Sequence, residues 1–144
     1  MTFAILRLDH VVLRIRNRSR MLHFYCDLLG CTLERELEDL GLIQLRAGAS
    51  IIDLLPIDKP LGQARQGEPL PQHANLEHFC LRIEPFDEAA LRRHFQAHGM
   101  AFEPAEVRYG ADGFGLSVYL TDPEGNIVEL KGPPRQPPAG SLRR

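Results

Sequence analysis

Alternation of apolar and polar side chains predicts two successive groups of short strands, with one helix in each group. In residues 8–15 this alternation puts Leu13 and Ile15 on one face of a strand and His10 on the other. Apolar residues at helical spacing follow, and a glycine ends that run. The first group is therefore expected to hold a helix from an N-cap at Ser19 to Gly30, and further strands at 31–36, 42–47 and 50–55.

The same order of elements is predicted again in the second half of the chain. Residues 59–75 are rich in proline and glycine, which is typical of a linker. Residues 132–144 hold four prolines and are expected to form a flexible tail. The second group is expected to comprise a strand at 76–83, a helix from an N-cap at Asp87 to Gly99, and strands at 101–108, 115–121 and 126–131.

The two groups also repeat in sequence. Residues 8–15 and 76–83 are identical at five of eight positions and align His10 with His78. Such duplication dictates architecture. We therefore predict an α+β fold of two βαβββ modules that form a curved, barrel-like mixed sheet with a central metal cleft. The expected boundaries are 1–58 for the first module, 59–75 for the linker, 76–131 for the second module and 132–144 for the tail.

Composition narrows the class of protein. The 144 residues carry a formal net charge of −2, so no strong positive field is available to recruit nucleic acid or an anionic membrane. No apolar run approaches the ~20 residues that span a bilayer, and the N-terminus does not resemble a signal peptide. A cytoplasmic protein is expected. The three cysteines are odd in number and lack Cys-x-x-Cys spacing, which favours reduced thiols.

Each repeat supplies one histidine and, on a later strand, one carboxylate. The four residues are His10, Asp53, His78 and Glu129. Two imidazoles and two carboxylates suit a divalent transition metal, Ni, Mn, Fe, Co or Zn, better than Ca or Mg. Taken singly, such residues are more often surface or hydrogen-bonded groups, but their equivalent positions favour a metal site. Asp53 is one methylene shorter than Glu129, so binding through water is an alternative to direct ligation.

Arginines repeat as well. Arg14 and Arg82 each lie four residues after a predicted metal-binding histidine. They are candidates to clamp an anionic group of a substrate, and pairing with nearby acids such as Asp9 or Glu84 is an equal alternative. Tyr109 and Phe114, at either end of a loop over residues 108–115, are candidates to cover the site or to pack within a turn.

These motifs resemble the vicinal oxygen chelate superfamily, which includes glyoxalase I, extradiol dioxygenases and bleomycin-binding proteins. The resemblance covers about residues 6–131. Its most specific part is Tyr-Leu-Thr-Asp-Pro-Glu-Gly-Asn-Ile-Val-Glu-Leu at 119–130. It implies paired βαβββ modules, a divalent metal in the cleft and a homodimer. The glyoxalase I-like ligand order is His, Glu, His, Glu, so Asp53 here replaces a glutamate.

The resemblance implies a metal-dependent lyase or isomerase. In such an enzyme the metal binds adjacent oxygens of a small substrate and stabilises an enediolate, while Glu129 acts as general base. Two alternatives stay open: an Fe(II) extradiol-type dioxygenase, and a small-molecule binding or antibiotic-resistance protein.

Overall fold

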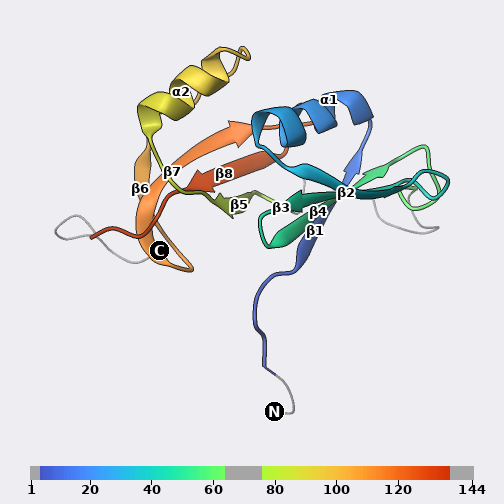
Figure 1. Cartoon of the computed structure of the whole chain (residues 1–144), viewed down its shortest axis with the longest axis horizontal. Helices are drawn as coiled ribbons and strands as arrows, with labels where there is room; N and C mark the ends of the chain where they lie inside the picture. The colour runs from blue at the N-terminus through green and yellow to red at the C-terminus, as the bar shows by residue number, and fades with distance from the viewer. Residues whose placement is uncertain (1–3, 64–75, 137–144) are drawn as a thin grey trace. The chain divides into compact units, whose positions relative to one another are not determined.

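The computed structural model describes residues 4–63 and 76–136, coloured in Figure 1. The chain divides into two compact units, Met1–Leu70 and Pro71–Arg144, which are described in turn. Most of the predicted linker, residues 59–75, and most of the predicted tail, residues 132–144, lie outside the described residues. None of the described helices is long and apolar enough to cross a membrane.

The first unit is a four-stranded mixed sheet with one helical segment (Figure 1). The strands lie in the order β1-β4-β3-β2; β1 is parallel to β4, and the other neighbours are antiparallel. Its elements are β1 (His10–Ile15), α1 (Arg18–Leu22), the π-helix η1 (His23–Leu28), β2 (Thr32–Leu37), β3 (Leu42–Ala47) and β4 (Ser50–Pro56).

One face of this sheet is the core of the first unit. Leu13 pairs with Leu54, and Leu54 pairs with Ile43, so these three side chains share a face. All three are buried. Phe24 and Tyr25 of η1 are also buried and make an edge-to-face ring contact. The apolar stripe of the helix and the apolar face of the sheet thus provide the burial that stabilises this unit.

The second unit repeats this arrangement. Its strands lie in the order β5-β8-β7-β6, with β5 parallel to β8 and the other neighbours antiparallel. Its core includes Val118 and Val128, and the ring of Phe95 packs edge-on to Phe102. The elements are β5 (Phe79–Arg82), α2 (Glu88–Gln96), β6 (Glu106–Gly110), β7 (Gly113–Thr121) and β8 (Ile127–Lys131).

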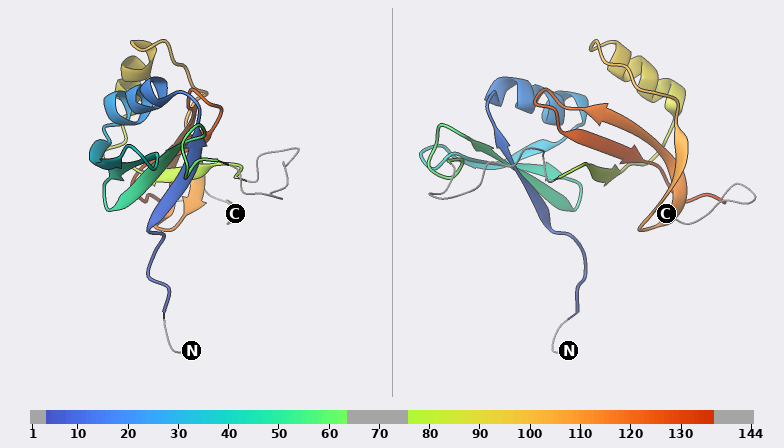
Figure 2. Two further views of the ribbon diagram at one scale, coloured as in Figure 1. Left: turned by 90° about the vertical axis from the view of Figure 1, so that its right-hand side faces the viewer. Right: turned by 180° about the vertical axis from the view of Figure 1, so that it is seen from behind.

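The predicted α+β fold of two βαβββ modules is confirmed, because both units show one strand, one helical segment and three further strands in the same sheet order. The two sheets are separate four-stranded sheets, and neither closes into a barrel on itself (Figure 2).

Two predicted boundaries are wrong for identifiable reasons. The first helix is capped by Asn17, whose side chain accepts the Arg20 backbone N–H, while Ser19 donates its hydroxyl to Asn17. The predicted strand at 101–108 starts only at Glu106.

The residues before Glu106 are held by α2 instead of by a sheet. Arg92 of α2 donates to the carbonyl of Phe102, and its guanidinium lies over the Phe102 ring. Glu88 of the same helix accepts the N–H of Ala105. Pro104, between them, has no N–H to give to a strand ladder.

Candidate functional site

His78 and Glu129 of the second unit meet on one face of its sheet. His78 directly precedes β5, and Glu129 lies on the neighbouring strand β8. The His78 Nε2 atom is 3.2 Å from Glu129 Oε2. Glu129 is 6% exposed, and burial of a polar group is costly unless hydrogen-bonding partners compensate it. Parallel pairing of β5 with β8 therefore joins two of the predicted residues.

Strand β7 supplies further polar groups to this pair. Ser117 is buried and donates its hydroxyl to Glu129 Oε1 at 2.6 Å. Tyr119 pairs with Glu129 in the β7–β8 ladder, and its ring lies edge-on to His78, with centroids 5.9 Å apart. Burial, together with the charge of Glu129, raises the pKa of Tyr119, so its phenol remains protonated at neutral pH.

The acid that precedes each histidine binds that histidine's Nδ1 atom. Glu77 contacts His78 Nδ1, and Asp9 lies 2.8 Å from His10 Nδ1. These contacts are the leading cause of the raised pKa of each imidazole, with Glu129 and Asp53 contributing through their charges. A carboxylate on Nδ1 fixes the ring and leaves Nε2 as the atom that faces a second partner.

The first unit places His10 and Asp53 at the same register positions. In the second unit, the residue two after His78 pairs with Glu129; in the first unit, the residue two after His10 pairs with Asp53. The Asp53 carboxylate is 7% exposed and accepts the Gln44 side-chain N–H at 3.0 Å. Across these described strands no ion pair joins Asp53 to His10, in keeping with its shorter side chain.

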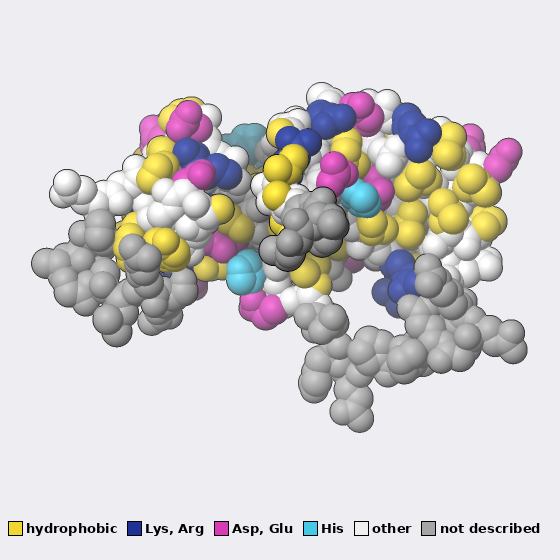
Figure 3. All heavy atoms as spheres, turned by 90° about the horizontal axis from the view of Figure 1, so that it is seen from below, with side chains coloured by type: hydrophobic (Ala, Val, Ile, Leu, Met, Phe, Trp, Pro, Cys, Tyr) yellow, Lys and Arg dark blue, Asp and Glu magenta, His cyan; other side chains and the backbone are white. Residues whose placement is uncertain are grey.

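In Figure 3, histidine side chains lie next to acidic side chains at separate places on the surface. The predicted set of four metal ligands includes one histidine and one carboxylate from each unit. The contacts given above are those within each unit. Among the residues that the structure describes, no three His, Cys, Asp or Glu side chains cluster tightly enough to hold a metal ion.

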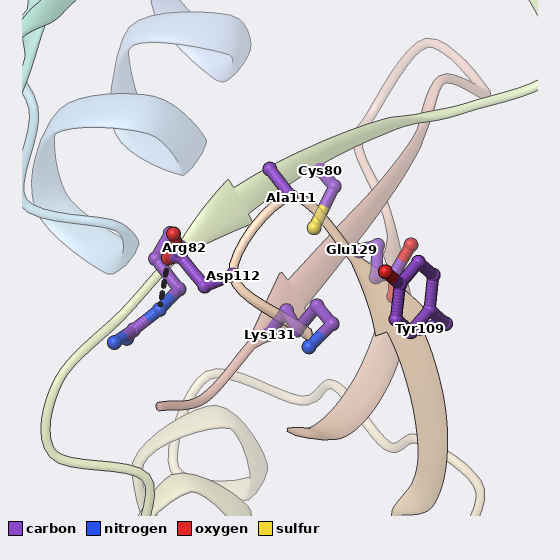
Figure 4. Close-up of a pocket in the computed structure, with 8 residues that line it drawn as sticks. Cys80, Arg82, Tyr109, Ala111, Asp112, Glu129 and Lys131 are labelled. Atoms are coloured by element: carbon purple, nitrogen blue, oxygen red, sulfur yellow. Dashed lines mark hydrogen bonds and ion pairs between the residues drawn. The ribbon is translucent and has the colours of Figure 1, made fainter. Parts of the chain in front are cut away.

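A pocket of about 210 Å³ opens beside Glu129 in the second unit (Figure 4). Cys80 lines it from β5, and partial desolvation of its thiol, with the nearby Glu129 charge, raises the pKa of Cys80 to about 12. The thiol therefore stays protonated and is a poor nucleophile. The pocket is lined by Cys80, Arg82, Tyr109, Gly110, Ala111, Asp112, Glu129 and Lys131.

The remaining candidates fall in different surroundings. Arg82 lines the pocket and pairs with Asp112 at 3.1 Å and with Glu84 at 3.2 Å. Tyr109 also lines the pocket, and its ring packs edge-on against Phe114 across the β6–β7 ladder. Arg14 is exposed and lies on the same face of β1 as His10.

Ser117, Tyr119 and Lys131 were not among the residues predicted for the site. Alignment of the two repeats contains a signal for one of them: Ile51-Ile-Asp-Leu-Leu55 matches Ile127-Val-Glu-Leu-Lys131, so a lysine stands where the first repeat has a leucine. Ser117 and Tyr119 reach Glu129 through the β7–β8 register, which the alternation within a single strand does not specify.

The sequence profile of the glyoxalase/bleomycin resistance protein/dioxygenase superfamily matches residues 7–130. The chain belongs to this superfamily. The chain is similar to the virulence protein STM3117 of Salmonella typhimurium. The two sequences are 27% identical over 124 residues, which cover 86% of this chain and 82% of that protein.

Solved structures agree with this superfamily fold. The crystal structure of virulence protein STM3117 has a TM-score of 0.70 at 24% identity and covers 92% of this chain and 100% of that one. Lactoylglutathione lyase from Agrobacterium tumefaciens has a TM-score of 0.59 at 22% identity, covering 88% of this chain and 92% of that one. At these identities the likeness shows the fold of the superfamily alone.

Proposed function

We propose that this chain is a metal-dependent enzyme of the vicinal oxygen chelate type, a glyoxalase-like lyase or isomerase acting on a small substrate with adjacent oxygens. The observation that carries the proposal is the buried Glu129 carboxylate 3.2 Å from His78 Nε2, on a face whose register is repeated around His10 and Asp53. The superfamily, which includes a lactoylglutathione lyase of the same fold, supports the reaction class.

The donor set fits a divalent transition metal. His78 and His10 each have Nδ1 engaged by the preceding acid, so Nε2 is the atom of each ring that would bind a metal; that of His78 faces Glu129. Glu129 and Asp53 are buried carboxylates, and neither pairs with an arginine or lysine in the described residues. Ni, Mn, Fe, Co or Zn would be held by these four residues and, when bound, would polarise the substrate oxygens as a Lewis acid.

The chain's own residues supply the proton chemistry. We assign Glu129 as the general base that takes a carbon-bound proton, because it is the buried carboxylate of the second unit that faces the pocket. Ser117 holds one carboxylate oxygen in place, which limits rotation of the side chain. Tyr119 and Cys80 keep their protons and flank Glu129 without competing for the proton that it accepts.

We extend the proposal to a homodimer, the assembly that the family resemblance implies. Ile5, Leu6 and Leu8 precede β1 and are 86%, 91% and 90% exposed. Three large apolar side chains exposed within four positions favour burial against another protein surface.

Elemental analysis with metal titration tests the metal assignment. We expect about one divalent transition metal ion per chain, with loss of that metal from the His78→Ala variant. The matched control is His23→Ala, because His23 also has a carboxylate partner, Asp27 at 2.7 Å, but lies on η1 away from the sheet face. Stoichiometric metal in His78→Ala would overturn the assignment.

Activity is tested separately by a screen that starts with the hemithioacetal of methylglyoxal and glutathione. Glu129→Gln keeps the size of the side chain and removes its basicity, so turnover should fall by about 10²-fold or more. Oxygen consumption measured in the same screen distinguishes the dioxygenase alternative.

A further inference from the structure

Lys131 is a buried cation with unused hydrogen-bonding capacity. It is 5% exposed. Among the described residues, it is the only basic side chain that is buried. Its Nζ atom donates to the carbonyl of Gly113 at 2.9 Å, which uses one of the three N–H groups of an ammonium. Burial of a charge is costly unless a partner compensates it.

Glycines of the β6–β7 hairpin make room for this side chain. A Cβ atom at Gly110 would come within 2.9 Å of Lys131 Cε, and one at Gly115 would come within 2.7 Å of Nζ. Side chains at either position would therefore displace the ammonium. The hairpin thus forms a cradle, defined here as Gly110, Gly113 and Gly115, that holds Lys131 in the wall of the pocket.

The other charged groups of the pocket have partners. Arg82 pairs with Asp112 at 3.1 Å, as Figure 4 shows. Glu129 is in contact with His78 and Ser117. For Lys131, by contrast, no carboxylate within residues 4–63 and 76–136 lies within 4.0 Å of Nζ. Lys131 therefore has no direct partner of opposite charge, and it lies on one strand with Glu129, two residues away.

The repeat shows that this lysine is not required by the fold. Leu55 holds the equivalent position in the first unit, two residues after Asp53 on β4. An apolar side chain therefore suits this place in the module, and the second unit has replaced it with a buried charge.

We propose that Lys131 is an anion subsite that binds an oxyanion of the substrate, a carboxylate or phosphate group, beside Glu129. The proposal rests on the proposed function in placing the substrate in this pocket, and it specifies a negatively charged substrate class. The two free N–H groups of the ammonium would bind the oxyanion, which would supply the missing counter-charge. The 210 Å³ pocket admits such a small group.

The chain offers a direct readout, because Lys59 and Lys131 are its two lysines. Full-length protein labelled with ¹³C-lysine gives two sets of Cε–Hε NMR signals, and Lys59→Arg assigns them. Inorganic phosphate and acetate are titrated separately at constant ionic strength. We expect a saturable shift of the Lys131 signals, with a dissociation constant on the order of millimolar, while Lys59 reports the bulk salt effect.

The two anions distinguish the source of the oxyanion. Saturation by phosphate alone assigns a phosphorylated substrate, and saturation by acetate alone assigns a carboxylate substrate. Saturation by both anions assigns a subsite that recognises charge. Each of these results supports the proposal. A Lys131 shift that is linear in anion concentration, or no larger than that of Lys59, would overturn it.

Two variants separate this proposal from the metal site. His78→Ala lacks a proposed metal ligand but keeps Lys131 and its cradle, so the anion shift should persist in it whatever its metal content. Gly110→Ala keeps the charges of Lys131 and Glu129 but puts a Cβ 2.9 Å from Lys131 Cε, with no other atom as close, so anion affinity should fall at least tenfold while metal content is unchanged. Unaltered anion affinity in Gly110→Ala would contradict a subsite built on this cradle.

Discussion

Glu129 depends on a single hydroxyl for its orientation. Ser117 is 1% exposed and donates to Glu129 Oε1 at 2.6 Å, while the other carboxylate oxygen faces His78. Residues that hydrogen-bond a metal-binding carboxylate hold it in the orientation that the metal needs, so their loss commonly weakens metal binding.

The Ser117→Ala variant is therefore expected to bind metal about 10- to 100-fold more weakly than the original chain. Competition with a chromophoric chelator measures this change. Ser50→Ala, at the start of β4 in the other unit, is the control and should leave affinity unchanged. Equal affinity in both variants would mean that Ser117 does not position the metal-binding form of Glu129.

Cys31 should make the first unit sensitive to alkaline pH. This thiol is buried, and burial raises the pKa of Cys31 from 9.0 to about 11. Between these two values the unfolded chain has released the proton while the folded chain still holds it. Since the folded state then binds more protons, the free energy of unfolding falls as pH rises from about 9 to 11.

Denaturant unfolding of the original chain and of Cys31→Ser, from pH 8 to 11, measures this contribution. Serine does not ionise in that range, so the stability advantage of Cys31 over serine should shrink steadily with pH. A constant difference would show that the thiol titrates alike in both states.

The repeated residues were predictable, whereas their supporting groups were not. His78 and Glu129 could be inferred because duplication marks equivalent positions, and the structure brings them together. Ser117 reaches Glu129 only through the pairing of β7 with β8, which the alternation within either strand does not reveal, whereas Lys131 could have been found by aligning the two repeats. Metal binding by the four candidates stays a prediction.

At the scale of elements, one carboxylate organises the β7–β8 connection. Asp122 is 3% exposed and accepts the backbone N–H groups of Glu124 and Asn126, and the side-chain N–H of Asn126. Gly125 has a φ of +88°, a conformation that favours glycine. The Asp-Pro-Glu-Gly-Asn segment therefore fixes the register that pairs Tyr119 with Glu129.

Loss of Asp122 should cost more stability than loss of a helix cap. Asp122→Ala leaves three part-buried N–H donors without this partner and is expected to lower the free energy of unfolding by about 3 kcal/mol. Asp87→Ala removes the N-cap that accepts the Ala90 N–H, which costs about 1 kcal/mol. Chemical denaturation of both variants compares them, and equal losses would mean that solvent replaces the Asp122 contacts.

Local sequence located most elements but failed where a helix competes with a sheet. The Asp87 cap and the strand at 42–47 follow from capping and alternation, and both are observed. Residues 101–105 were expected to begin a strand, yet Pro104 has no N–H for a ladder, and Glu88 and Arg92 bind backbone groups of this segment. Those contacts join residues 10 to 17 positions apart, so no local pattern reveals them.

At the scale of the whole molecule, the segment before β1 exposes large apolar side chains that would be more stable when buried against another protein surface. Leu6 and Leu8 are 91% and 90% exposed, which is a large apolar area for a chain of net charge −2 to present to water. A second copy of the chain would bury these side chains, since superfamily resemblance implies a homodimer.

Light scattering after size exclusion should therefore give a mass near twice the 16.3 kDa of one chain. The double variant Leu6→Ser, Leu8→Ser removes apolar area without touching either sheet, so the dimer dissociation constant should rise at least tenfold, given about 1.5 kcal/mol or more for each buried leucine. Leu40→Ser, also at an exposed leucine in the first unit, controls for a general loss of hydrophobicity. If the double variant and the control dimerise equally well, the segment before β1 does not form the interface, and the exposed leucines need a different partner.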